Sequence, residues 1–110
     1  MTPYTVDRTK WEKMTIFEQL GNIYSEVGRS FEAKKRGAMA LAMPAMYRAI
    51  DLFDATVEVL VRNKSPKTKE VLRAKEVYLN TIFDSGEAAE KMASLDRYFY
   101  QFAVAARRQR

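Results

Sequence analysis

The fold is decided by residues 15–31, which read TIFEQLGNIYSEVGRSF. The stretch begins with a capping box, in which the side chains of Thr15 and Glu18 can each accept a hydrogen bond from the other's backbone N–H. Apolar residues then recur at alternating spacings of four and three, beside an aromatic stripe: Ile16, Leu20, Ile23 and Val27, then Phe17, Tyr24 and Phe31. Such a broad apolar face is typical of a helix that packs against other helices, and predicts an all-α protein.

Three further helices follow from the same periodicity and from their ends. We expect helices over about residues 15–36, 38–63, 66–83 and 87–107 of a single domain spanning residues 1–110. Gly37 ends the first helix, and Ser65-Pro66 supplies a cap and a first-turn proline for the third. The short connections favour an antiparallel up-down-up-down four-helix bundle.

The inward faces of the last three helices can be read from the apolar spacing. They comprise Met39, Met43, Met46, Ile50, Phe53, Val57 and Leu60; then Val71, Ala74, Tyr78 and Ile82; then Met92, Leu95, Phe99, Phe102 and Ala106. Pro44 interrupts the second helix and predicts either a kink near Ala40 or a start only at Pro44. A second capping box that begins at Thr9 predicts that the first helix extends backwards by about two turns.

The composition excludes many catalytic chemistries, because the chain has no histidine and no cysteine. Serine catalysis with a histidine base, thiol chemistry and the usual zinc or haem sites all need those side chains. Most carboxylates, Glu26 and Asp51 among them, fall off the apolar stripes, so solvated faces explain them better than an all-carboxylate metal site. There is no glycine-rich phosphate loop. We therefore predict a protein that is not an enzyme and holds no cofactor or metal.

Location and solubility follow from the apolar content. Apolar residues make up 47% of the chain and charged residues 30%, which is typical of a globular protein. The N-terminus lacks the apolar run of a secretory signal, and no stretch reaches the roughly 18 apolar residues of a membrane span. We expect a cytoplasmic protein without a membrane partner.

The positive charge is unevenly distributed once the helices alternate in direction. One end of such a bundle collects Arg8, Lys10, Lys13, Arg62, Lys64, Lys67, Lys69, Arg107, Arg108 and Arg110. Lys67 and Lys69 lie in the first turn of a helix, where the dipole favours acids, so their placement favours an external anion such as nucleic-acid phosphate. The predicted contacts are Lys67, Lys69, Arg107 and Arg108. The alternative is a solubilising surface with a basic tail.

Gly21, Ser25 and Gly28 form a line of small residues on the first helix. Glycine inside a helix costs about 1 kcal/mol relative to alanine, so the line suggests that another backbone approaches there. Two interpretations stay open: tight packing within the bundle, or a subunit interface through which the protein self-associates.

Five stretches carry a family resemblance that covers most of the chain. They are residues 14–23 (MTIFEQLGNI), 25–27 (SEV), 46–53 (MYRAIDLF), 72–77 (LRAKEV) and 97–108 (RYFYQFAVAARR). This pattern resembles a small uncharacterised prokaryotic all-helical protein family, from which the chain departs at Pro44. No established activity comes with that resemblance.

At a coarser level the chain is similar to two sets of prokaryotic four-helix proteins. One comprises the ribosomal-RNA intervening-sequence proteins and the accessory variability determinant of diversity-generating retroelements, and implies a basic oligomer that touches nucleic acid. The other is the HEPN domain, whose ribonuclease members use an arginine and a histidine. Without histidine this chain would be a catalytically silent member. The sequence thus predicts a binding or adaptor module, or alternatively a structural or regulatory protein that oligomerises through its first helix.

Overall fold

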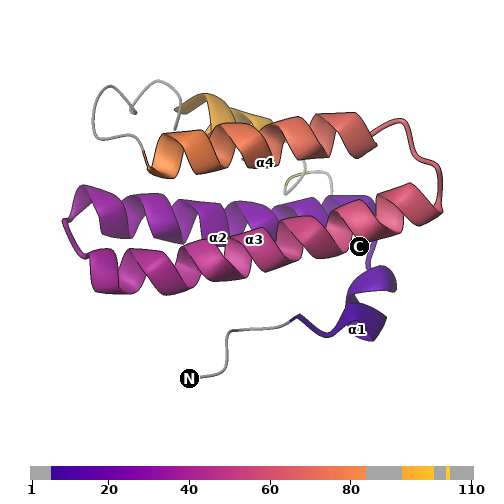
Figure 1. The fold of residues 1–110 in the computed structure, drawn as a ribbon, viewed down its shortest axis with the longest axis horizontal. Helices are drawn as coiled ribbons and strands as arrows, with labels where there is room; N and C mark the ends of the chain where they lie inside the picture. The colour runs from indigo at the N-terminus through magenta and orange to yellow at the C-terminus, as the bar shows by residue number, and fades with distance from the viewer. Residues whose placement is uncertain (1–5, 84–92, 101–103, 105–110) are drawn as a thin grey trace.

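All regular structure in the described residues, 6–83, 93–100 and 104, is helical in the computed structural model, as the sequence predicts. The helices are α1 (Arg8–Glu12), α2 (Ile16–Lys35), α3 (Met39–Arg62) and α4 (Thr68–Ile82), and residues 93–100 are also helical (Figure 1). The expected start of the last helix near residue 87 lies outside the described residues. None of the helices in the described part of the chain is long and apolar enough to cross a lipid bilayer.

Helix α2 begins and ends as the sequence predicts. The hydroxyl of Thr15 accepts from the backbone N–H of Glu18 at 3.1 Å, and the Glu18 carboxylate accepts from the N–H of Thr15 at 3.0 Å. At the other end Gly37 has a φ of 73°, and the N–H of Ala38 reaches back to the carbonyl of Ala33 at 2.9 Å. This pattern is a Schellman motif, which needs a left-handed residue after the helix. It turns the chain so that α3 lies beside α2 and runs in the opposite direction (Figure 1).

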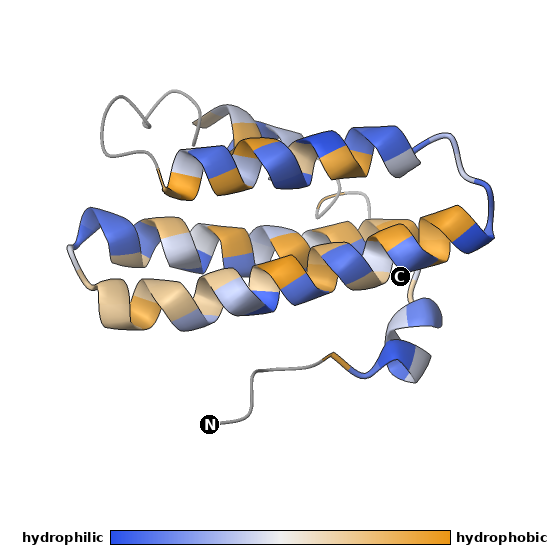
Figure 2. Cartoon of the chain, viewed as in Figure 1, coloured by the Kyte–Doolittle hydropathy of each residue, from blue (hydrophilic) through white to orange (hydrophobic). Residues whose placement is uncertain are grey.

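The predicted apolar faces form the core. Those that are confirmed as buried include Leu20, Ile23 and Val27 on α2; Met46, Phe53 and Leu60 on α3; Val71, Ala74, Tyr78 and Ile82 on α4; and Leu95 and Phe99 in the last described helix. In Figure 2 the hydrophobic residues form stripes along these helices. Met39 is the exception, since it is 47% exposed in the first turn of α3. The predicted core residues Met92, Phe102 and Ala106 lie outside the described residues.

Tyr78 lies at the centre of this core and is fully buried. Its ring packs against those of Phe31 and Phe53, with centroid distances of 5.4 and 6.0 Å, and Phe53 packs against Phe99 at 5.7 Å. The Tyr78 hydroxyl shares a 2.7 Å hydrogen bond with the hydroxyl of Ser30. Rings from α2, α3, α4 and residues 93–100 therefore form one connected cluster.

The structure corrects the prediction that α2 extends backwards through Thr9. Residues 8–12 form a separate helix, α1, whose N-cap is Asp7: its carboxylate accepts from the N–H groups of Thr9 and Lys10 at 3.0 and 3.2 Å. The chain then leaves helical geometry before Thr15 begins α2. The physical reason is Trp11, which is 4% exposed and donates to Thr56, so that α1 packs against α3.

Helix α3 begins at Met39, so a start at Pro44 is wrong. Proline lacks an N–H, and in the second turn of a helix this leaves one carbonyl, that of Ala40, without its usual donor. Ala40 is exposed, so water can satisfy that carbonyl and the helix continues through the proline. The kink near Ala40 stays a prediction.

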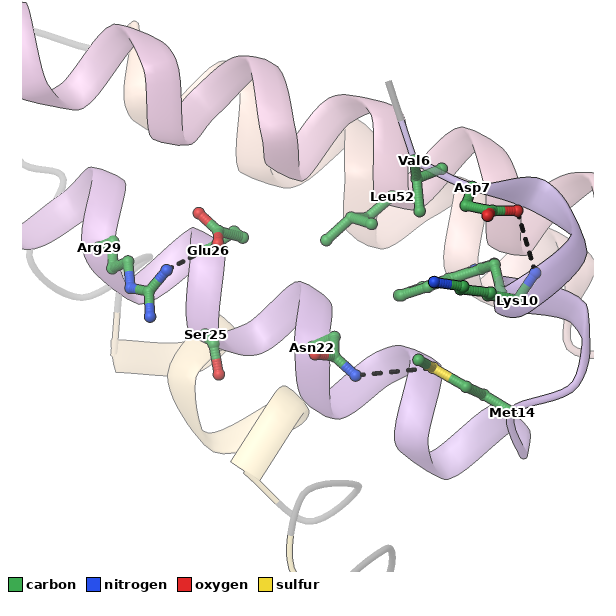
Figure 3. A pocket seen from close by; sticks show the side chains of 10 residues that line it. Val6, Asp7, Lys10, Met14, Asn22, Ser25, Glu26, Arg29 and Leu52 are labelled. Carbon is green, nitrogen blue, oxygen red and sulfur yellow. Dashed lines mark hydrogen bonds and ion pairs between the residues drawn. The ribbon is translucent and has the colours of Figure 1, made fainter. Parts of the chain in front are cut away.

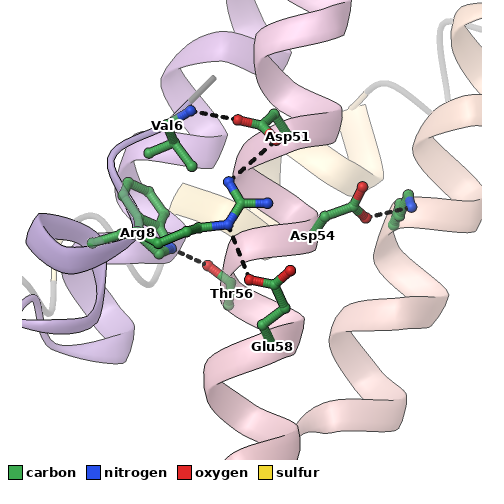
Figure 4. Close-up of polar contacts among 8 residues, drawn as sticks. Val6, Arg8, Asp51, Asp54, Thr56 and Glu58 are labelled. Carbon is green, nitrogen blue, oxygen red and sulfur yellow. Dashed lines mark hydrogen bonds and ion pairs between the residues drawn. The ribbon is translucent and has the colours of Figure 1, made fainter. Parts of the chain in front are cut away.

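Polar contacts fasten α1 and the residue before its cap to α3 (Figure 4). The indole N–H of Trp11 donates to the hydroxyl of Thr56 at 2.9 Å, and both side chains are buried. The backbone N–H of Val6 donates to the Asp51 carboxylate at 2.6 Å. Arg8 binds Asp51 at 3.2 Å and Glu58 at 3.0 Å. These contacts place α1 across α3 although it is too short to be stable alone.

Replacing Thr56 with valine keeps the shape of the side chain but leaves the buried indole N–H of Trp11 without an acceptor. We expect Thr56→Val to lower the free energy of unfolding by about 1–3 kcal/mol, measured by urea denaturation. The double variant Thr56→Val with Trp11→Phe should lose less free energy of unfolding than the two single variants lose together, because it removes both partners of the bond. Strictly additive losses would contradict a direct bond.

Burial raises the pKa of Tyr78 to about 12 from its ordinary value of 10.0, and it outweighs the hydrogen bond to Ser30, which lowers the pKa. An unfolded tyrosine loses its proton near pH 10, so between about pH 10 and about pH 12 only the unfolded state is deprotonated. The free energy of unfolding should therefore fall by about 1.4 kcal/mol per pH unit for this group. In Tyr78→Phe the fall should be shallower. Urea midpoints across this pH range would test it, and parallel slopes for the two proteins would contradict it.

Candidate nucleic-acid interface

Cations from several helices gather at one end of the molecule. Figure 1 shows α1, the start of α2, the end of α3 and the connection to α4 at the same end, and an ion pair of 3.0 Å between Arg62 and Glu12 ties α3 to α1. We call this the basic end and define it by its described cations: Lys10, Lys13, Arg62, Lys64, Lys67 and Lys69. In Figure 2 α1 and the connection between α3 and α4 are mostly hydrophilic.

The cations that the sequence predicts at this end differ in whether a carboxylate neutralises them. Arg8 forms ion pairs with Asp51 and Glu58 of α3, and its side chain is 38% exposed. We therefore do not count it among the cations of the basic end. Arg62 stays there but pairs with Glu12. In contrast Lys13, Lys64 and Lys69 are exposed, and no carboxylate in the described part of the chain pairs with them.

Lys64 has the left-handed backbone that glycine or asparagine usually supplies. Its φ is 50°, and it follows the end of α3 in a second Schellman motif, where the N–H of Ser65 binds the carbonyl of Leu60 at 2.9 Å. A lysine in this conformation costs roughly 1–2 kcal/mol relative to an unstrained backbone. The fold therefore places a cation where an uncharged glycine would be cheaper. The sequence feature that could have pointed to Lys64 is the end of α3, where no glycine follows the helix.

Helix α4 begins two residues later than Pro66, because Ser65, Pro66 and Lys67 form a turn instead of the first helical residues. The hydroxyl of Ser65 accepts from the N–H of Lys67 at 3.2 Å, and its carbonyl accepts from the Thr68 hydroxyl at 2.8 Å. Lys67 is thus the N-cap residue and is half-buried, while Lys69 is exposed in the first turn. The other two predicted contacts, Arg107 and Arg108, lie outside the described residues.

At the opposite end of the molecule, part of the positive charge is structural. The Lys34 ammonium donates to the carbonyls of Thr81 and Ile82 at 3.3 and 2.7 Å. These are among the last carbonyls of α4, which have no partner within the helix. Lys34 therefore stabilises the end of α4, whereas Lys35 and Arg36 are exposed.

Gly28 is not closely packed against the described part of the chain. A Cβ added to it would meet no described atom within 4 Å, so packing among the described residues does not explain this glycine. Tight packing of the line as a whole stays a prediction. Ser25 is exposed and Gly21 half-buried. The subunit-interface interpretation stays a prediction.

A pocket of about 390 Å³ lies between α1 and α2 (Figure 3). Its lining comprises Val6, Asp7, Lys10, Trp11, Met14, Asn22, Ser25, Glu26, Arg29 and Leu52. The α2 members recur at spacings of three, one and three, so they form one polar stripe along the helix. Sequence reasoning missed the pocket, because this stripe looked like a solvated face and only the docking of α1 encloses it.

Glu26 corrects that interpretation most clearly. Its side chain is only 12% exposed and lies between two arginines: Arg29 binds one carboxylate oxygen at 2.9 Å and Arg48 binds the other at 3.0 Å. Glu26 therefore ties α2 to α3 and is not a solvated residue. Among the described residues no three acidic side chains gather closely enough to hold a metal ion.

Comparisons with known proteins do not assign the chain to a family. No family model, no curated protein and no solved structure matches it. The resemblances to small prokaryotic helical proteins, to the intervening-sequence type and to HEPN domains therefore stay predictions. The placement of charge and the pocket are the features from which function can be inferred.

Proposed function

We propose that this protein is a non-catalytic binding module whose basic end contacts the phosphate backbone of nucleic acid without reading its sequence. The observation that carries the proposal is Lys64, a cation held in a left-handed conformation that an uncharged glycine would adopt at lower cost. Strained residues persist where the surrounding structure and the function require them. Here the strain presents a positive charge at the end where other cations gather.

The neighbouring lysines support a phosphate partner. Lys13, Lys64 and Lys69 are exposed and come from three separate segments of the chain. Each can replace a condensed counterion on a polyanion, which is the main source of affinity in binding that ignores sequence. Lysine presents a single point charge on a flexible stem and lacks the planar fork with which arginine reads guanine. The expected contacts are therefore with phosphates and not with base edges.

We further infer that the helix containing residues 93–100 completes an antiparallel four-helix bundle. Leu95 and Phe99 are buried, and Phe99 packs against Phe53 of α3. A fourth helix antiparallel to α4 would end at the basic end. Arg107 and Arg108 would then join Lys67 and Lys69 there, which supports all four as contacts.

Reversing two charges at the basic end tests this function. We expect Lys67→Glu with Lys69→Glu to weaken binding of a labelled DNA duplex and of a single-stranded RNA, measured by fluorescence anisotropy. The slope of log affinity against log salt should become shallower by about two, since two phosphate contacts are lost. The matched control is Lys35→Glu with Arg36→Glu, which changes the net charge equally at the opposite end.

An equal loss in both double variants would show that only net charge matters, and would overturn the assignment of the basic end. Lys64→Gly gives an independent check. It removes one contact and relieves the left-handed strain, so affinity should fall while the free energy of unfolding rises by about 1 kcal/mol. Wild-type protein that binds neither nucleic acid at about 50 mM salt would end the proposal.

A second candidate function is self-association through the line formed by Gly21, Ser25 and Gly28. The open space around Gly28 supports it, because no other part of the described chain explains a glycine there. An interface in which a second copy approaches this line would give the glycine a reason.

The two substitutions Gly28→Ala and Gly28→Leu distinguish self-association at this line from a monomeric protein. If the second copy packs on Gly28, leucine should shift the mass measured by sedimentation equilibrium towards the monomer, and alanine should do so less. In a monomer, alanine should simply raise the free energy of unfolding by up to about 1 kcal/mol. Wild-type protein that sediments as a monomer would contradict self-association.

A further inference from the structure

We propose that the pocket between α1 and α2 is a binding site for a small organic anion that carries an apolar group. This site shares Lys10 with the basic end, but its other lining residues lie outside the phosphate contacts proposed there. Its volume of about 390 Å³ falls within the range of small-molecule sites in proteins. Six of its ten lining residues are polar or charged, and four are apolar: Val6, Trp11, Met14 and Leu52.

The donors around the pocket favour an anion, because three of the four carboxylate oxygens beside them already have partners. One oxygen of Asp7 accepts from two N–H groups of α1. Glu26 is bound on both oxygens, by Arg29 and Arg48. Lys10 is exposed and has no carboxylate partner in the described part of the chain, and Arg29 uses one of its five N–H donors on Glu26. The donors left over in the pocket therefore belong to cations.

The apolar part of the ligand has a surface to contact. Leu52 of α3 and the side chains of Trp11 and Met14 line the pocket, and the first two are almost fully buried. Figure 3 shows Asn22, Ser25 and Arg29 along α2, with the Asn22 amide donating to the Met14 sulfur. A ligand with a charged group and an apolar body matches this division better than an inorganic ion does.

Trp11 is the only tryptophan in the chain, so the pocket contains its own fluorescent reporter. The probe is anilinonaphthalene sulfonate, an anion with an aromatic body, and its uncharged analogue N-phenyl-naphthylamine is the matched control. We expect saturable binding of one sulfonate probe per chain, with quenching of Trp11 emission. The uncharged analogue should bind at least about tenfold more weakly, since it lacks the group that meets the cations.

Variants locate the site. Lys10→Gln and Arg29→Gln should each lower the affinity for the sulfonate probe by about tenfold, because each removes one charge-assisted contact. Lys69→Gln removes the same charge outside the pocket and should change the affinity by less than about twofold. Ser25→Phe places a ring in the pocket from an exposed position and should abolish binding. Circular dichroism checks that each variant is folded.

Three results would overturn the proposal: equal binding of the charged and uncharged probes, equal loss in the lysine variants at positions 10 and 69, or unchanged binding in Ser25→Phe. The nucleic-acid titrations fail or succeed separately. Lys69→Gln should lower the affinity for the DNA duplex and leave the affinity for the sulfonate probe unchanged. Ser25→Phe should lower the affinity for the probe and leave that for the duplex unchanged.

Discussion

The packing of rings around Tyr78 is the contact on which the rest of the structure depends. Phe31 and Phe53 bring α2 and α3 to this residue of α4, and Phe99 joins the helix of residues 93–100 to the cluster through Phe53. Aromatic pairs at such distances stabilise beyond the area they bury. The Tyr78 hydroxyl is satisfied by Ser30, so the polar atom costs little in the core. Because this cluster holds the helices side by side, the helix ends and the charges near them lie at the two ends of the molecule.

The core also decides which charges remain available. Where α1 docks through Trp11, it brings Arg8 within reach of Asp51 and Glu58 on α3, and an ion pair forms that the sequence spacing of more than forty residues does not suggest. The same docking encloses the polar stripe of α2 and creates a pocket. At the end of α3, a left-handed turn directs Lys64 outwards. The geometry of both proposed sites is therefore a consequence of packing elsewhere.

Individual residues show how far sequence reasoning reaches in the candidate sites. The gathering of Lys67 and Lys69 with other cations at one end follows from helix directions, which short connections determine. The neutralisation of Arg8 and Arg62 does not follow, because it depends on which carboxylate a neighbouring helix brings close. Glu26 looks solvated in the sequence because periodicity locates a residue relative to its own helix only. Arg29 and Arg48 bury it from two helices.

The sequence by itself determined the all-helical class, the capping box of α2, the turn at Gly37 and most of the buried faces. Each of these depends on residues within a few positions of one another, where spacing and side-chain chemistry are sufficient. Only the tertiary structure decided that α1 is a separate helix, that no described residue packs closely on Gly28 and that a pocket lies beside Ser25. Those features depend on contacts between residues distant in the chain, whose distances no local pattern contains.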